Sequence, residues 1–127
     1  MMADTKKILL IVEDEVRLAG VLRETFESQG FDVEVAKTGA EAFKMILTTQ
    51  PRVIILDIML PDVDGMSILH RIRTEKGGEN IPIIVLTNLS PDERIMKGVV
   101  RDEPSYYLVK ADTPIDRIVE KVKEILV

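Results

Sequence analysis

Short apolar runs along the chain alternate with segments whose apolar residues have helical spacing. The runs predict five strands, at residues 8–12, 31–36, 53–56, 83–86 and 106–109. Continuous apolar runs such as residues 8–12 are typical of strands buried on both faces of a sheet. Residues 31–36 instead alternate between apolar and polar positions, as a strand with one polar face does.

Between these runs, apolar residues recur three or four positions apart and predict five helices. Gly30, typical of a C-terminal helix cap, follows the first helix, whose apolar positions are Leu18, Val21, Leu22 and Phe26. The second helix covers residues 39–49, ahead of Pro51, and its inward face is predicted at Ala40, Phe43, Ile46 and Leu47.

The three remaining helices are predicted from the same spacing. The third is marked by Met66, Leu69 and Ile72. The fourth is expected to begin near Pro91, and its apolar positions are Ile95, Met96 and Val99. The fifth has the clearest apolar stripe, at Ile115, Ile118, Val119, Val122, Ile125 and Leu126.

This strict alternation of strands and helices predicts an α/β fold. Short connections between them imply right-handed crossovers and a mostly parallel sheet with helices on both faces. In such sheets, ligands bind at the carboxyl ends of the strands, where the strand order reverses. The residues at these ends are polar and are expected to meet at one edge: Glu13, Asp14, Asp57, Thr87 and Lys110.

Length and composition indicate one soluble domain. The 127 residues are enough for a single core, expected at about residues 6–127 after a polar N-terminal extension at residues 1–5. No apolar run is long enough to cross a bilayer, and the first residues do not have the apolar core of a signal peptide. The chain has no cysteine, which excludes disulfides and thiolate metal sites and fits a cytoplasmic location.

The charge balance argues against two classes of partner. The net charge is −5, whereas a protein that binds nucleic acid through its phosphates needs an excess of Lys and Arg. We therefore expect neither direct binding to nucleic acid nor binding to an anionic membrane surface.

The polar residues at the strand ends have a chemistry in common. Three carboxylates at one edge repel each other unless a cation lies between them, and Mg²⁺ suits an all-oxygen site. Asp57 could then act as a nucleophile and form an acyl phosphate. The Lys110 ammonium and the Thr87 hydroxyl could stabilise the charge on the phosphoryl oxygens together with the metal.

With these residues in this order, the chain resembles the receiver domains of two-component response regulators, the CheY-like superfamily. Residues 8–15 resemble the opening strand of that family and the acidic pair that follows it. Residues 57–65, Asp-Ile-Met-Leu-Pro-Asp-Val-Asp-Gly, are similar to the family's phosphoacceptor loop. Residues 85–87 and 107–110 resemble the two remaining motifs, all in the family's order and spacing. The resemblance implies a doubly wound (βα)5 flavodoxin-like sandwich whose five-stranded parallel sheet has the order 2-1-3-4-5.

The resemblance also implies residue roles. Asp57 would be the phosphoacceptor, and Lys110 would pair with the phosphoryl group. Mg²⁺ would be bound by Asp14, by Asp57 and by the backbone carbonyl of Met59, with Glu13 acting directly or through water. Thr87 and Tyr107 would form the switch: Thr87 would move toward the phosphate, and Tyr107 would turn inward behind it.

The partners follow from the same resemblance. A histidine kinase or histidine phosphotransfer protein would supply the phosphoryl group. The face made by the fourth helix, the fifth strand and the fifth helix would then change and control binding of a downstream target, with the domain a monomer or a phosphorylation-dependent dimer. No separate substrate is expected, so the domain would not be an enzyme in the usual sense.

The chain departs from the family pattern near the site. Ala111 replaces the proline that usually follows the lysine through a cis bond, and a non-proline cis bond costs about 3 kcal/mol. Asn88 replaces a small residue after Thr87 and could narrow access to the site. Glu103-Pro104 replaces a common Gly-Ala, so the fourth helix should end unusually.

Two further positions bear on the lifetime of a phosphoryl group. Met59 and Leu89 lie two residues after Asp57 and Thr87, and neither side chain can position an attacking water. We therefore hypothesise a long-lived phosphorylated state.

The same residues allow other interpretations. Glu13 and Asp14 could cap the first helix instead of binding metal, and His70 fits a helix surface better than a phosphorelay site. A phosphohydrolase of the aspartate-nucleophile class would have an aspartate at the position of Met59, and a flavin mononucleotide would be repelled by the acidic residues after the first strand. A phosphorylation-independent interaction module stays the alternative, and the chain could be a stand-alone receiver or part of a longer regulator or hybrid kinase.

Overall fold

In the described parts of the chain, the sheet has five parallel strands in the order β2-β1-β3-β4-β5. The computed structural model describes residues 7–63, 65–75 and 78–126, so the expected N-terminal extension lies outside the described residues. The strands are β1 (Ile8–Val12), β2 (Asp32–Ala36), β3 (Val53–Leu56), β4 (Ile83–Thr87) and β5 (Tyr106–Val109). Parallel pairing and strand order confirm the predicted doubly wound fold.

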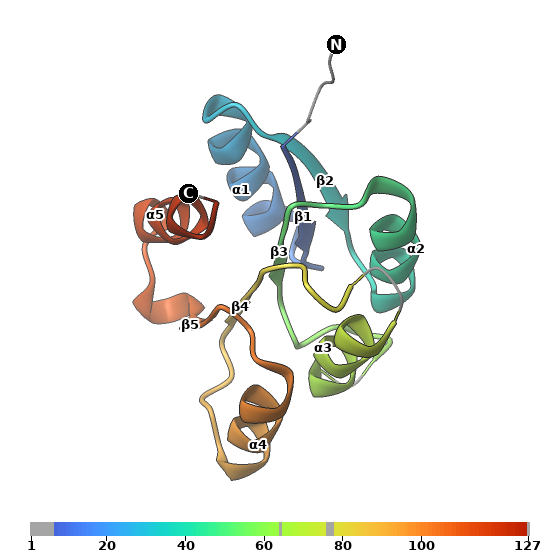
Figure 1. Ribbon diagram of the computed structural model, residues 1–127. Helices are drawn as coiled ribbons and strands as arrows, with labels where there is room; N and C mark the ends of the chain where they lie inside the picture. The colour runs from blue at the N-terminus through green and yellow to red at the C-terminus, as the bar shows by residue number, and fades with distance from the viewer. Residues whose placement is uncertain (1–6, 64, 76–77, 127) are drawn as a thin grey trace.

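Helices cover both faces of this sheet (Figure 1). They are α1 (Val16–Ser28), α2 (Gly39–Thr49), α3 (Gly65–Thr74), α4 (Glu93–Asp102) and α5 (Ile115–Ile125), with a short 3₁₀ helix, η1 (Lys110–Asp112), after β5. Helices α1 and α5 lie on one face, and α2, α3 and α4 lie on the other. No helix in the described parts of the chain combines the length and the apolar character that a membrane span requires.

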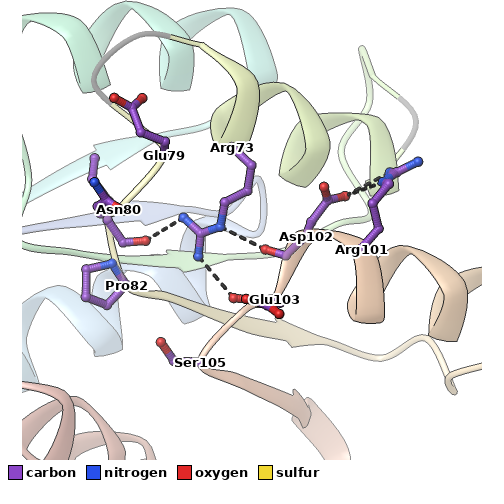
Figure 2. Close-up of a pocket in the computed structure, with 9 residues that line it drawn as sticks. Arg73, Glu79, Asn80, Pro82, Arg101, Asp102, Glu103 and Ser105 are labelled. Atoms are coloured by element: carbon purple, nitrogen blue, oxygen red, sulfur yellow. Dashed lines mark hydrogen bonds and ion pairs between the residues drawn. The ribbon is translucent and has the colours of Figure 1, made fainter.

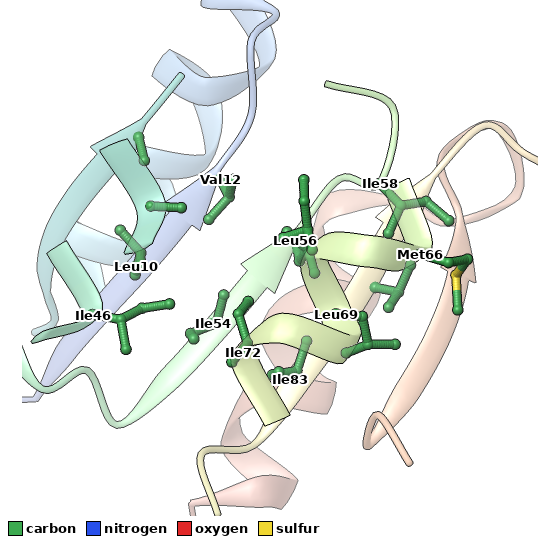
Figure 3. Close-up of a cluster of buried hydrophobic side chains, with 14 of the residues drawn as sticks. Leu10, Val12, Ile46, Ile54, Leu56, Ile58, Met66, Leu69, Ile72 and Ile83 are labelled. Atoms are coloured by element: carbon green, nitrogen blue, oxygen red, sulfur yellow. The ribbon is translucent and has the colours of Figure 1, made fainter. Parts of the chain in front are cut away.

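Two hydrophobic cores form because successive side chains of a strand point to opposite faces. In β1, Leu9 and Ile11 join the core under α1 and α5, whereas Leu10 and Val12 join the core under α2, α3 and α4. Figure 3 shows this second core, in which α3 packs across β3 and β4. Burial on both faces explains why β1, β3 and β4 are continuous apolar runs.

The inward face of α2 differs from the predicted one. The helix turns Gly39, Ala42 and Ile46 toward the sheet, a spacing of three and four residues, and half-buries Phe43. The prediction of Ala40 and Leu47 as inward residues is wrong: both are exposed, Leu47 to 64%. The apolar residues of α2 are spread over more than one face, so the spacing alone did not fix the rotation of the helix.

Two other residues that marked the helical stripes are also exposed. Val21 in α1 and Met96 in α4 lie on the outer edge of their helices, while Leu22 and Ile95 beside them are buried. The existence of both helices is nevertheless confirmed, as are the end of α1 before Gly30 and the start of α4 near Pro91.

The helix ends explain several of the predicted boundaries. Gly30 has a φ of 94° after α1, and its position as a left-handed cap is confirmed. Helix α4 begins two residues after Pro91, because the Asp92 carboxylate accepts a hydrogen bond from the backbone N–H of Ile95 at 2.9 Å. At its other end Glu103 adopts a left-handed conformation with a φ of 46°, which confirms the expected unusual end before Pro104.

Candidate functional site

The carboxyl ends of four strands bring the predicted polar residues to one edge of the sheet. Val12 and Leu56 are paired in the sheet, so Glu13 and Asp57, which directly follow them, leave the sheet side by side. Leu56 pairs in turn with Val85 of β4, and the last residue of β4, Thr87, pairs with Val109 of β5, directly before Lys110. The register therefore explains how residues from distant parts of the chain meet.

Three carboxylates gather at this edge. Carboxylate oxygens of Glu13, Asp14 and Asp57 all lie within 4.8 Å of one another. Glu13 and Asp57 are buried, whereas Asp14 is exposed. Such a set of hard oxygen donors, open to solvent on one side, can hold a divalent metal ion.

The Lys110 ammonium lies between the two buried carboxylates. Its Nζ is 2.8 Å from Glu13 Oε1 and 2.8 Å from Asp57 Oδ2. Burial raises the pKa of Glu13, and the negative charge of Asp57 adds to this, against the opposing hydrogen bond from Lys110. Burial alone would lower the pKa of Lys110, but its hydrogen bonds to Asp57 and Glu13 outweigh this and raise it. Lys110 therefore stays charged and neutralises part of the acidic cluster.

Backbone N–H groups orient the same two carboxylates. Asp57 Oδ1 accepts a hydrogen bond from Met59 N at 2.9 Å, and Glu13 Oε2 accepts one from Glu15 N at 3.1 Å. Glu15 is the N-cap residue of α1, and its side chain makes no capping hydrogen bond. The alternative in which Glu13 and Asp14 serve only to cap α1 is not supported by this geometry.

Thr87 and Tyr107 are connected through one residue of the β4–α4 loop. The Thr87 side chain is fully buried, and its Oγ1 accepts a hydrogen bond from Leu89 N at 3.4 Å. The half-buried Tyr107 donates its hydroxyl proton to the carbonyl oxygen of Leu89 at 2.8 Å. Burial raises the pKa of Tyr107, and the charges of Asp92 and Asp57 raise it further. Asn88 is exposed, and its effect on access stays a prediction.

The segment after β5 has a regular geometry in spite of the missing proline. Residues 110–112 form η1, and no peptide bond in the described parts of the chain is cis, so Ala111 follows Lys110 through a trans bond. The Thr113 hydroxyl donates to the carbonyl oxygen of Val109 at 2.8 Å and closes this turn.

His70 lies away from the acidic cluster, as its interpretation as a helix-surface residue predicted. Its Nδ1 is 2.9 Å from Oδ1 of Asp102, a buried carboxylate at the end of α4 that also binds the Arg101 guanidinium at 2.8 Å. Burial alone would raise the pKa of Asp102, but the hydrogen bonds from Arg101 and His70 outweigh it and lower that pKa.

A second polar cluster, which the sequence did not indicate, surrounds Arg73 at the opposite edge of the sheet (Figure 2). The guanidinium donates to the backbone carbonyls of Ile81 at 2.6 Å, Asp102 at 2.8 Å, Gly78 at 3.2 Å and Glu103 at 3.3 Å. A pocket of 340 Å³ lies beside it, between the segments that precede β4 and β5. These groups bind one another, so Arg73 joins the ends of α3 and α4.

Comparison with known proteins agrees with this geometry. The sequence profile of the response regulator receiver domain matches residues 9–123. The chain is 32% identical over 118 residues to the phosphate regulon transcriptional regulatory protein PhoB of Rhizobium meliloti (strain 1021), covering 93% of this chain and 51% of PhoB. The chain thus spans about half the length of this curated relative.

Two solved structures share the fold along almost the whole chain. The CheY-like response regulator receiver domain protein of Methanospirillum hungatei JF-1 has a TM-score of 0.87 at 24% identity, with 96% of this chain and 94% of that chain covered. The BeF3-activated N-terminal receiver domain of Klebsiella pneumoniae RstA has a TM-score of 0.81 at 28% identity, with 94% and 97% covered. The chain therefore belongs to the response regulator receiver domain family, the phosphoacceptor modules of two-component signalling.

Proposed function

We propose that Asp57 accepts the phosphoryl group, that Mg²⁺ is required, and that the modification switches the face formed by α4, β5 and α5. The observation that carries this proposal is the placement of Asp57: a buried carboxylate at the sheet edge, 2.8 Å from a lysine and grouped with two further acidic side chains. A carboxylate so placed is a nucleophile with its charge-stabilising groups already in position.

The transfer uses groups that the structure brings together. An Asp57 oxygen forms the new bond to phosphorus, and the bond between phosphorus and the donor nitrogen of a phosphohistidine breaks, with its electron pair leaving on the imidazole. Lys110, now bound to Asp57 Oδ2, is placed to pair with the phosphoryl oxygens. The Thr87 hydroxyl oxygen accepts a hydrogen bond from the Leu89 N–H, so its own proton is free to be donated to an oxygen of the phosphoryl group.

The donor set fits Mg²⁺. Asp14, Asp57 and the backbone carbonyl of Met59 would hold the ion, with Glu13 acting directly or through a water molecule. Lys110 compensates one of three negative charges, so a divalent cation complements what remains. When bound, the metal supplies charge neutralisation for the phosphoryl oxygens.

The switch would start at Thr87 and pass through Leu89. Because Thr87 binds the Leu89 N–H and Tyr107 binds the Leu89 carbonyl, displacement of Thr87 toward a phosphoryl group disturbs both contacts. The β4–α4 loop would then move together with Tyr107. Helix α4 has two exposed apolar residues, Met96 and Val100, which would form part of a surface for a protein partner.

The wider role follows as part of the proposal. A histidine kinase or histidine phosphotransfer protein supplies the phosphoryl group in the cytoplasm, and a downstream protein binds the switched face as the readout. The domain acts on no separate substrate and makes no direct contact with nucleic acid or membrane, and it is a monomer or a phosphorylation-dependent dimer. The convergence of Asp57, Lys110 and Glu13 favours this function over a phosphorylation-independent module.

Phosphorylation of the purified chain tests the proposal. The chain is incubated with acetyl phosphate with and without Mg²⁺, and its intact mass is measured beside that of Asp57→Asn and of Asp32→Asn, a control at an exposed position on β2. We expect one added phosphoryl group in the wild type and in Asp32→Asn, only with Mg²⁺, and none in Asp57→Asn. Modification that persists in Asp57→Asn, or no modification by acetyl phosphate or by histidine kinases, would contradict the assignment.

A further inference from the structure

The phosphoacceptor loop is bound to the start of α2 by the side chain of Asp62. Asp62 Oδ1 accepts a hydrogen bond from Gly39 N at 2.9 Å, and Oδ2 accepts one from Ala40 N at 3.2 Å. These two N–H groups belong to the first turn of α2, where no carbonyl of the helix itself can accept them. A residue that lies 22 and 23 positions further along the chain therefore completes the helix end.

The cap of α2 is divided between a local part and a distant part. The local part is similar to a capping box: Thr38 Oγ1 accepts from Glu41 N at 3.1 Å, and Glu41 Oε1 accepts from Lys37 N, one residue before the N-cap, at 3.0 Å. The distant part is the Asp62 carboxylate. The hydrogen bond from Gly39 N is the main cause that holds the pKa of Asp62 below its ordinary value, so the carboxylate is charged at neutral pH and favours the positive end of the helix dipole.

A second contact between the loop and α2 lies beside the first. A Cβ atom on Gly39 would come within 2.7 Å of Val63 Cγ2, closer than carbon atoms approach without moving. The absence of a side chain at Gly39 thus lets Val63 rest against the helix start. Asp62 and Val63 together fix the end of the loop that Asp57 begins.

The loop between Asp57 and Asp62 is short, so the contact of Asp62 with α2 lies close to the phosphoacceptor site. At its start, Asp57 N donates to the carbonyl oxygen of Val12 at 2.9 Å, and Asp57 Oδ1 accepts from Met59 N. The anchor at Asp62 follows only three residues after Met59, and Pro61, with its restricted φ, stands between them. A displacement of Asp62 would therefore move the backbone of Met59 by nearly the same amount.

We propose that Asp62 is a positioning residue for the metal site: by binding the start of α2, it sets the place of the Met59 carbonyl relative to the carboxylates of Asp57 and Asp14. The inference rests on the proposed function, because it takes the Met59 carbonyl as a ligand of Mg²⁺. It assigns to Asp62 a role at the site although its side chain faces another helix.

The test compares the two halves of the cap. Asp62→Ala removes the two hydrogen bonds between the loop and the helix, and Thr38→Ala removes a local hydrogen bond, from Glu41 N, at the same helix end. Two properties are measured: amide hydrogen exchange at Met59 in metal-free protein by NMR, and the dissociation constant of Mg²⁺ by calorimetry. Neither measurement depends on phosphoryl transfer.

We expect Asp62→Ala to speed exchange at Met59 and to weaken Mg²⁺ binding by about fivefold each, the factor that corresponds to a lost helix-capping interaction. Thr38→Ala should lower the stability of the protein but leave both properties within about twofold of the wild type on the same basis. Equal effects of the two substitutions, or no effect of Asp62→Ala, would overturn the proposal.

Two further variants keep the test decisive if Asp62→Ala folds poorly. Asp62→Asn retains an amide oxygen that can accept one of the two hydrogen bonds, so it should recover part of the Mg²⁺ affinity. Gly39→Ala favours helix formation but displaces Val63, so it should weaken Mg²⁺ binding without lowering the stability of α2. A wild type that binds Mg²⁺ but is never phosphorylated would refute the proposed function and leave the positioning role standing.

Discussion

Replacing Lys110 by methionine is the most direct probe of the charge balance at the sheet edge. The substitution keeps an unbranched apolar stem that ends one atom short of the lysine nitrogen, and it removes the ammonium between Glu13 and Asp57. In the wild type that ammonium is 2.8 Å from an oxygen of each carboxylate, and its side chain is only 13% exposed. The variant leaves two buried carboxylates facing each other without a cation.

The cost can be estimated from the distances. At an effective dielectric constant of about 20, a separation of 2.8 Å corresponds to about 6 kcal/mol of gross attraction for each pair. Most of this is offset by the cost of removing the charges from water, and breaking a buried pair by removing one partner typically costs about 3–5 kcal/mol net. Because the site is open to solvent at Asp14, we expect a loss of about 3 kcal/mol in the free energy of unfolding without metal.

Mg²⁺ should reverse much of this loss. A divalent cation at the carboxylates would take over the neutralisation that Lys110 provides, and the variant no longer has an ammonium that repels the metal. Since a ligand that binds only the folded state adds stability according to its affinity, we expect Mg²⁺ to stabilise Lys110→Met more than the wild type.

Urea unfolding followed by circular dichroism, with and without Mg²⁺, measures both effects. Lys121→Met serves as a matched control, because Lys121 contacts the ring of Tyr106 and Glu124 on α5, away from the site. The reasoning is refuted if Lys110→Met loses less than about 1 kcal/mol without metal, or if Mg²⁺ stabilises all three proteins equally.

Two further predictions concern stability and one concerns the phosphorylated state. Glu103→Gly should stabilise the protein by up to about 1 kcal/mol in urea unfolding. Glycine removes the strain of a side chain in the left-handed conformation of residue 103, and this gain exceeds the larger entropy that glycine loses on folding. Hydrogen bonds from Arg101 and His70 outweigh burial and lower the pKa of Asp102 from its ordinary 3.8. The ionised carboxylate therefore stabilises the fold above pH 3.8, and this stability should be lost as the pH falls below that value. Asp102→Asn should flatten this part of the curve of unfolding free energy against pH. The acyl phosphate should survive for minutes or longer in an assay of phosphate release, since Met59 is exposed and apolar, and a half-life of seconds would contradict this.

The elements that carry the site were predictable because their signals are local. The buried strands are continuous apolar runs, and the rule that ligands bind at the carboxyl ends of parallel strands selects Glu13, Asp57, Thr87 and Lys110 without any coordinates. The structure brings these residues to one edge. Pro104 predicted an unusual end for α4, but not the left-handed conformation that Glu103 adopts there.

The features that were missed depend on where distant segments meet. Asp62 caps a helix that begins 23 residues earlier, and Arg73 binds carbonyls of two loops, so no local pattern indicates either contact. The rotation of α2 depends on its packing against β1 and β2. The sequence does not show this packing, because Ile46 and Leu47 are both large apolar residues. The contact between Glu13 and Lys110 was likewise not expected, because the sequence assigned Glu13 to the metal.

The clamp formed by Arg73 gives α4 one fixed end. Its hydrogen bonds to the carbonyls of Asp102 and Glu103 tie the end of the helix to the segment before β4, whereas the start of α4 follows the loop that holds Leu89. A ten-residue helix is about 15 Å long. A displacement that begins at Leu89 would therefore rotate α4 about its C-terminal end at Asp102. Glu93, at the start of the helix, would be displaced most, and Val100 would be displaced little. A partner that contacts Met96 and the start of α4 would sense the switch, whereas its contact with Val100, near the fixed end, would change little.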